Sequence, residues 1–145
     1  MAYFVTGATG FIGHHLVERL LKRGKPVYAL VRKGSQKKLD ALRQALGATD
    51  KTLIAVEGDL AQTRLGVSDA TLKKLKGKID HVFHLAAIYD LAASAEDQKV
   101  ANVQGTRNAV RFAEAVGAGC FHHVSSIAAA GLYEGTFRED MFEAA

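Results

Sequence analysis

Apolar and polar positions repeat with two periods along the chain, and their order predicts strands that alternate with helices. Short apolar runs predict five strands, at residues 3–6, 27–31, 53–56, 79–85 and 120–124. Apolar side chains at three- and four-residue spacing predict helices over residues 12–23, 35–46, 68–75 and 94–116. Residues 127–145 show no clear element. This alternation implies right-handed crossovers and a doubly wound α/β fold, with a parallel sheet of strand order 3-2-1-4-5.

A glycine-rich turn joins the first predicted strand to the first predicted helix. Gly7, Gly10 and Gly13 form the spacing G-x-x-G-x-x-G, a variant of the dinucleotide-binding fingerprint. We expect Gly7 to let the chain turn off the strand, Gly10 to leave room for a pyrophosphate, and Gly13 to let the helix press against the sheet. The free N–H groups of the helix start would then face the phosphates. Because a strand precedes the turn and a helix follows it, a nucleotide site is favoured over a turn without chemistry.

The composition is that of an ordinary soluble globular domain. The chain has 145 residues, of which 48% are hydrophobic and 23% charged, and we treat residues 1–145 as one domain. No apolar run approaches 18 residues, so no membrane span is predicted, and the N-terminus lacks the pattern of a secretory signal. The cytoplasm is therefore the expected compartment. Cys120 is the only cysteine, which excludes an internal disulfide, and we expect it to be a small buried residue.

The net charge of +4 is concentrated in one stretch. Residues 32–43 contain five cations and one acid, and the rest of the chain is neutral. One local basic patch suits a single phosphate group better than a nucleic-acid backbone. The sequence also has no basic stripe with interleaved aromatic residues. We therefore expect no nucleic-acid partner.

The residues that follow the second predicted strand indicate which cofactor is bound. Arg32 and Lys33 lie about 20 residues after the glycine turn, where a free ribose 2′-hydroxyl requires Asp or Glu and a 2′-phosphate requires Arg. The sequence thus predicts NADP(H) rather than NAD(H), with a solvated basic loop as the alternative. Ser35 would add a hydrogen bond to the same phosphate.

Other polar residues fall at or near strand ends. Asp59 follows the third strand, where its carboxylate can accept a hydrogen bond from an adenine amino group or serve only the local turn. His84 lies within the fourth strand and is expected to be a packed residue. The alanines after it, at positions 86 and 87, would let the backbone approach a cofactor.

Two histidine pairs raise the question of a metal site. Adjacent residues on a strand point to opposite faces, so His122 and His123 cannot share one ion, and neighbours on a helix such as His14 and His15 also diverge. No cysteine or carboxylate is expected to complete a ligand set. We therefore predict no metal, and His14 is instead placed near the pyrophosphate.

Five ordered motifs resemble those of the extended short-chain dehydrogenase/reductases. They are Thr6 to Gly13, Gly58 to Leu60, His84 to Ala87, Asn102 to Thr106, and Val124 to Ser126. The resemblance covers essentially the whole chain and is strongest to the thioester and fatty acyl-CoA reductase branch, with dihydroflavonol-reductase-type ketone reductases also similar.

The resemblance implies a Rossmann fold that supports hydride transfer from a nicotinamide. In such enzymes Asp59 would contact adenine, Asn102 would hold its helix in catalytic geometry, and Ser126, or else Ser125, would hydrogen-bond the substrate carbonyl oxygen. Without the resemblance, capping of the strand end would be the favoured role of the two serines. The remaining cofactor contacts implied by the motifs are Thr9, Phe11, Ile12, Leu60, Leu85, Ala86 and Ala87.

One feature of the family is missing. Four residues after Tyr133 stands Phe137 rather than Lys, so the Tyr-x-x-x-Lys pair of these enzymes is absent. We expect the chain to be the cofactor-binding N-terminal portion of a longer NADP(H)-dependent enzyme that reduces a small carbonyl or acyl thioester, and to be inactive alone. A non-catalytic NADP(H) sensor and a nucleotide-sugar epimerase or dehydratase are the alternatives. Oligomeric state stays open, with a homodimer of the full-length protein as one option.

Overall fold

Five parallel strands form one sheet at the centre of the molecule. The computed structural model describes residues 1–86, 94–141 and 143. The strands are β1 (Ala2–Thr6), β2 (Val27–Val31), β3 (Leu53–Glu57), β4 (Ile79–His84) and β5 (Cys120–His123). They pair in parallel in the order β3-β2-β1-β4-β5, which confirms the predicted doubly wound sheet and its strand order.

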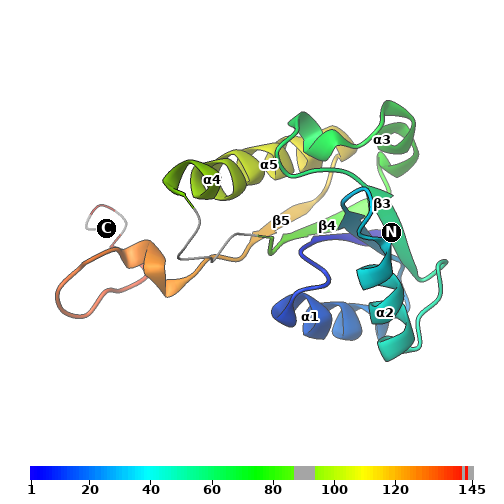
Figure 1. Cartoon of the computed structure of the whole chain (residues 1–145), viewed down its shortest axis with the longest axis horizontal. Coiled ribbons are helices and arrows are strands. Elements are labelled where there is room, and N and C mark those ends of the chain that lie inside the picture. The colour runs from blue at the N-terminus through cyan, green and yellow to red at the C-terminus, as the bar shows by residue number, and fades with distance from the viewer. Residues whose placement is uncertain (87–93, 142, 144–145) are drawn as a thin grey trace.

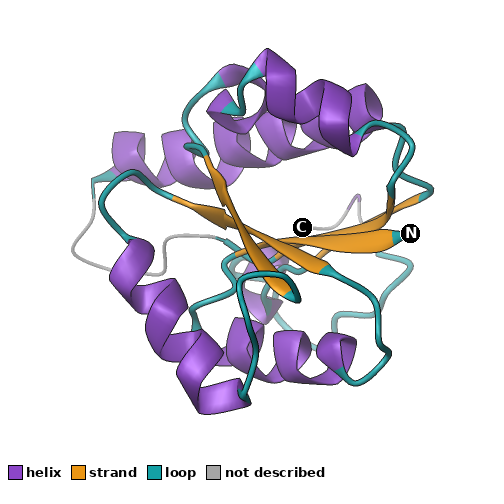
Figure 2. Cartoon of the chain, turned by 90° about the vertical axis from the view of Figure 1, so that its right-hand side faces the viewer, coloured by secondary structure: helices purple, strands orange, loops and turns teal. Residues whose placement is uncertain are grey.

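Helices cover both faces of the sheet, which gives a three-layer arrangement (Figures 1 and 2). One layer contains α1 (Phe11–Leu21) and α2 (Gln36–Leu46), and the other contains α3 (Asp69–Leu75), α4 (Ala95–Lys99) and α5 (Gly105–Val116). Shorter turns of helix are η1 (Thr63–Gly66), η2 (Val100–Gln104) and η3 (Ile127–Ala130). The segment that follows β5 extends away from the sheet (Figure 1).

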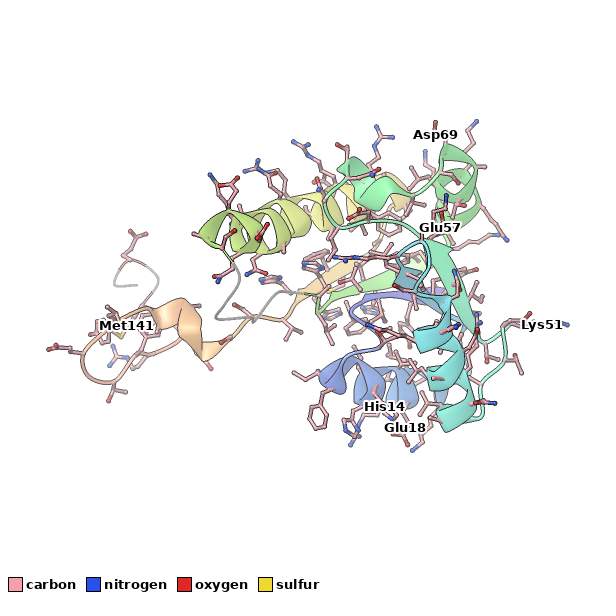
Figure 3. The ribbon with its side chains drawn as sticks, viewed as in Figure 1. His14, Glu18, Lys51, Glu57, Asp69 and Met141 are labelled. Carbon is pink, nitrogen blue, oxygen red and sulfur yellow. The ribbon has the colours of Figure 1, made fainter. Side chains whose placement is uncertain are left out.

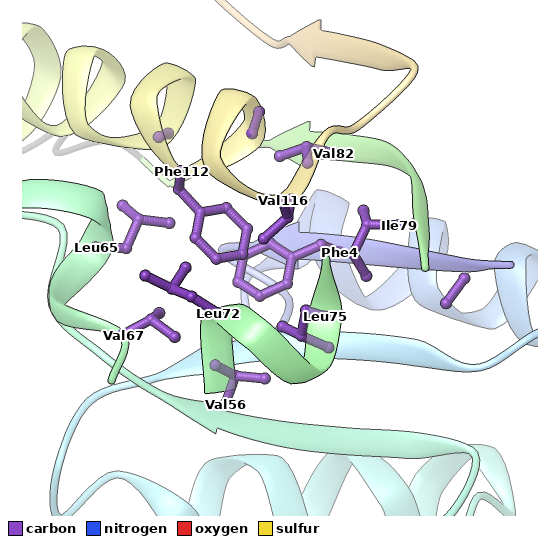
Figure 4. Close-up of a cluster of buried hydrophobic side chains, with 13 residues drawn as sticks. Phe4, Val56, Leu65, Val67, Leu72, Leu75, Ile79, Val82, Phe112 and Val116 are labelled. Carbon is purple, nitrogen blue, oxygen red and sulfur yellow. The ribbon is translucent and has the colours of Figure 1, made fainter. Parts of the chain in front are cut away.

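Each face of the sheet has its own apolar core. Under α3 and α5, the rings of Phe4 and Phe112 lie 4.3 Å apart and are fully buried (Figure 4). Under α1 and α2, buried side chains such as Val5, Val17 and Leu39 form the second core. Each such side chain contributes about 1.5–3 kcal/mol when it is removed from water. The alternation of the strand pattern divides the side chains between the two cores.

The helix predicted over residues 94–116 is present over residues 95–116, but it is not α-helical throughout. It consists of α4, then η2, which is a π-helical turn, and then α5. The Thr106 hydroxyl donates to the Asn102 carbonyl oxygen at 2.7 Å within this stretch. A π turn holds one residue more than an α turn, and apolar spacing does not reveal it, so the sequence predicted the helical stretch but not the π turn within it.

The predicted burial of Cys120 was wrong. Cys120 is exposed, because β5 is an edge strand of the described sheet and begins at this residue.

The other predicted elements are present with small differences at their ends. α1 ends at Leu21, and α2 ends before Gly47, whose φ of +63° is the left-handed cap that glycine favours.

Candidate functional site

A groove of about 1290 Å³ lies where the strands end. Its lining comes from the segments that follow all five strands, because parallel strands bring their carboxyl ends to one edge of the sheet. The lining includes these residues predicted for the site: Gly7, Thr9, Gly10, Phe11, Ile12, Gly13, Arg32, Ser35, Asp59, Leu60, Leu85, Ala86, Ser125 and Ser126. Ala87 lies outside the described residues.

The glycine turn is tightly packed at two of its three glycines. Gly7 has φ +75°, and a Cβ there would lie 2.8 Å from the Ala86 nitrogen at the end of β4. A Cβ on Gly13 would collide with the Gly7 carbonyl oxygen and approach Ala8 to 2.8 Å. The absence of a side chain at Gly13 therefore lets the start of α1 lie directly against Gly7 and Ala8 of the turn.

Gly10 differs from its neighbours because it is exposed and has space around it. A Cβ on Gly10 would meet only the Gly7 oxygen, at an ordinary 3.4 Å. Gly10 is also the N-cap of α1 and supplies no side chain to cap the helix. The first-turn N–H groups, which have no partner within the helix, therefore lie at the groove with the positive end of the helix dipole. Phe11 and Ile12 beside them are 83% and 59% exposed.

The basic side of the groove is formed by Arg32 and Lys38, and Ser35, which lies between them in the sequence, also lines it. Lys33 is exposed and is not among the described residues that line the groove. Arg43 is held elsewhere, because its Nε donates to the Leu53 carbonyl oxygen at 2.9 Å and its Nη1 pairs with Asp40. Lys38 was not predicted for the site, although this lysine belongs to the basic patch and lies about one helical turn after Ser35.

The loop after β3 is held in place from two sides. The Ala61 N–H donates to Asp59 Oδ1 at 2.9 Å, so one carboxylate oxygen already serves the local turn. The buried Asn108 on α5 donates from Nδ2 to the Leu60 carbonyl oxygen at 2.8 Å. Asp59 is half-buried at the groove, and its second oxygen can still face a ligand.

His84 is 1% exposed and lies below the groove between two threonines, in agreement with its predicted packing. Its Nδ1 lies 2.7 Å from the Thr6 hydroxyl, and its Nε2 lies 3.3 Å from the Thr106 hydroxyl. The Ala86 N–H donates to Thr6 Oγ1 at 3.3 Å, and Thr106 donates to the Asn102 carbonyl oxygen.

These directions assign the tautomer of the His84 ring. Because the Thr106 hydroxyl donates to Asn102, it accepts from Nε2–H of His84, and Nδ1 then accepts from Thr6. Burial, with a smaller contribution from His123, lowers the pKa of His84 from 6.5 to about 4. The ring is therefore neutral at pH 7 and links the end of β1 to the π turn.

Asn102 itself is half-buried in η2 and is not among the described residues that line the groove. The chain of hydrogen bonds reaches its backbone carbonyl through Thr106. π turns occur frequently at functional sites, which makes η2 a feature of interest beside the groove.

The serines after β5 lie at the groove's far end. The Val124 N–H donates to the His84 carbonyl oxygen at 3.1 Å, and this bond extends the strand pairing to just before Ser125. Ser125 is exposed and Ser126 is half-buried, and both line the groove together with Val124.

His14 was predicted to lie near the pyrophosphate, but it is not among the described residues that line the groove. Figure 3 shows His14 and Glu18 on the side of α1 that faces away from the sheet, and neither residue is part of the groove lining.

Among the described residues, no helix is both long and apolar enough to span a membrane.

The chain is similar to known reductases. The family model described as male sterility protein matches residues 5–145. A putative fatty acyl-CoA reductase of Drosophila melanogaster is 31% identical over 78% of this chain and 25% of its own length. The chain spans only 3% to 25% of the length of the curated relatives that it matches.

Two solved structures resemble the fold closely. The terminal R domain of the myxalamid PKS-NRPS pathway has a TM-score of 0.74 and 31% identity, over 88% of this chain and 35% of that domain. The yeast methylglyoxal/isovaleraldehyde reductase Gre2, complexed with NADPH, has a TM-score of 0.74 and 25% identity, over 90% of this chain and 38% of its own.

Proposed function

Because the chain belongs to the male sterility protein family of extended short-chain dehydrogenase/reductases, we propose that it is the cofactor-binding part of an NADP(H)-dependent reductase. The substrate class in this proposal is a carbonyl compound or an acyl thioester. The Drosophila relative is named for an acyl-CoA, and the yeast enzyme is named for aldehydes and is complexed with NADPH.

One observation carries the proposal. A single groove brings together the open start of α1, the cations Arg32 and Lys38, and the serines after β5. A dinucleotide needs a site for its diphosphate, a site for its ribose and adenine, and a place where nicotinamide meets substrate. In the proposal, the ribose and adenine lie beyond the end of β2, the diphosphate beyond the end of β1 and the nicotinamide beside the end of β5, which follows the strand order β3-β2-β1-β4-β5.

The glycine turn fits a diphosphate in particular. Gly10 is the one of the three glycines where the protein itself would tolerate a side chain, yet that side chain would occupy the groove in front of the helix amides. In the proposal, these amides hold the diphosphate. The guanidinium of Arg32 holds the ribose 2′-phosphate, with help from Ser35 and Lys38.

At the other end of the groove, the proposed role of Ser126 is to donate a hydrogen bond to the substrate carbonyl oxygen. Such a bond stabilises the negative charge that develops on this oxygen in the transition state. NADP(H), when bound, supplies the hydride. The sequence contains no Tyr-x-x-x-Lys pair, so the proposal assigns the proton donor to residues outside these 145. A cytoplasmic location and a homodimer stay predictions.

Fluorescence titrations with NADPH and NADH test the cofactor assignment. We expect the chain to bind NADPH more tightly, and Arg32→Ala to erase most of this preference. A charged hydrogen bond is worth about 1.5–3 kcal/mol, which corresponds to a roughly 10- to 150-fold change in affinity. Lys38→Ala should give a smaller loss.

Lys33→Ala is the matched control, because Lys33 neighbours Arg32 but is not part of the groove lining. It should leave both affinities nearly unchanged. Equal affinities of the unmodified chain for NADPH and NADH would overturn the assignment of the cofactor.

A further inference from the structure

A cluster of metal-ligand residues lies on β4 and β5, apart from the groove. It consists of His81, Cys120 and His122, referred to here as the His/Cys cluster. We propose that this cluster is a binding site for a zinc-type divalent transition-metal ion, with water as the fourth ligand.

The register of the sheet brings the three residues together. His81 pairs with Cys120 across the two strands, and the next positions on the same face pair Phe83 with His122. Cys120 and His122 are two residues apart, so their side chains share this face, whereas His123 points to the other. The Nδ1 or Nε2 atoms of the histidines and the Sγ atom of the cysteine all lie within 4.8 Å of one another.

Neighbouring rings fix the orientation of the histidines. The His122 ring stacks on Phe83 with centroids 4.4 Å apart and an interplanar angle of 10°. The His81 ring lies 5.2 Å from His122 and 5.9 Å from Tyr3. Because the rings are held before any ion arrives, a metal site here loses little side-chain entropy on binding.

The distances suit tetrahedral coordination. Zinc binds histidine nitrogen at about 2.0–2.1 Å and cysteine sulfur at about 2.3 Å, which places tetrahedral N and N about 3.3 Å apart and N and S about 3.6 Å apart. His81 Nδ1 and His122 Nε2 are 3.0 Å apart. Cys120 is exposed, so rotation of its side chain can close the remaining separation from the nitrogens.

Binding exchanges one hydrogen bond and one proton for three metal bonds. The hydrogen bond between the two rings breaks, and the ring that donated it moves that proton to its other nitrogen through solvent. The Cys120 thiol releases its proton to solvent, and two metal–nitrogen bonds and one metal–sulfur bond form. Affinity should therefore fall as the pH is lowered.

The ligand set favours this type of ion. Two imidazoles and one thiolate are borderline-to-soft donors, which suit zinc and related ions and not magnesium or calcium. A bound ion would also join β4 to β5, three residues before Ser125. None of the three ligands belongs to the groove lining, so the site does not depend on the proposed cofactor.

Cobalt(II) and zinc(II) titrations of the purified, metal-free chain test the proposal. We expect one ion per chain, and a cobalt–thiolate charge-transfer absorption that Cys120→Ser abolishes. His81→Ala and His122→Ala should each weaken binding by about tenfold or more. Zinc should also slow alkylation of Cys120 in the unmodified chain, but not in either alanine variant.

His123→Ala is the matched control, because His123 follows His122 but lies on the opposite face of the strand. It should retain the stoichiometry, the absorption band and the protection of Cys120. Circular dichroism confirms that each variant is folded. The proposal fails if cobalt gives no thiolate band, or if His123→Ala weakens binding as much as His122→Ala does.

Discussion

Replacing His84 should change how the stability of the protein depends on pH. The neutral ring is 1% exposed and is hydrogen-bonded by threonines at both nitrogens. Its pKa is lowered from 6.5 to about 4, first by burial and then by His123. Protonation would place a charge in the core and leave the Thr6 hydroxyl proton without its acceptor.

The direction of the effect follows from proton binding. Between pH 6.5 and about 4 the unfolded chain binds a proton at His84 and the folded chain does not, so this group's contribution to stability is complete above pH 6.5 and is lost as the pH falls toward 4. At about 1.4 kcal/mol per pH unit, the loss reaches at most about 3 kcal/mol.

Urea unfolding of the unmodified chain and of His84→Gln, at pH values from 7 to 4 and constant ionic strength, measures this contribution. Glutamine does not titrate, so we expect the variant to be less stable by about 1 kcal/mol at pH 7 because a hydrogen bond is lost. The stability difference should then shrink or reverse as the pH falls, because only the unmodified chain loses the contribution of His84. The carboxylates act equally on both proteins and cancel.

The exposed His15 provides the control, and His15→Gln should follow the pH dependence of the unmodified chain. His123→Ala should slightly reduce the stability that His84 loses in acid, because it removes the smaller cause of the lowered pKa of His84. A stability difference between the unmodified chain and His84→Gln that stays constant from pH 7 to 4 would refute the reasoning.

Other substitutions test the packing around the groove. Gly13→Ala should destabilise the fold by about 2 kcal/mol or more, because its Cβ would collide with the turn, whereas Gly10→Ala should retain stability and lose NADPH affinity; thermal unfolding and titration separate the two effects. Asn108→Ala should cost about 1–3 kcal/mol in urea unfolding, because it leaves the Leu60 carbonyl oxygen without its donor. Phe112→Ala should cost about 3–5 kcal/mol by the same measurement, since it opens a cavity against a fully buried core.

Local chemistry was enough to predict the sheet and most of the groove. The apolar runs gave the strands, and their alternation with helices left few topologies, so the order β3-β2-β1-β4-β5 could be predicted and is confirmed. Because the carboxyl ends of parallel strands share one edge, residues such as Arg32 and Ser126 could be placed together although 94 positions separate them.

The rest depended on side-chain direction and strand register, which sequence spacing does not reveal. The sequence predicted a buried Cys120 and no ligand set around His122. Only the pairing of β4 with β5 decided that His81 faces Cys120, at the exposed edge of the sheet. Likewise, the π turn and the hydrogen bonds of His84 join residues from three separate segments. Such contacts form only when the whole sheet is assembled, because each partner is supplied by a different part of the chain.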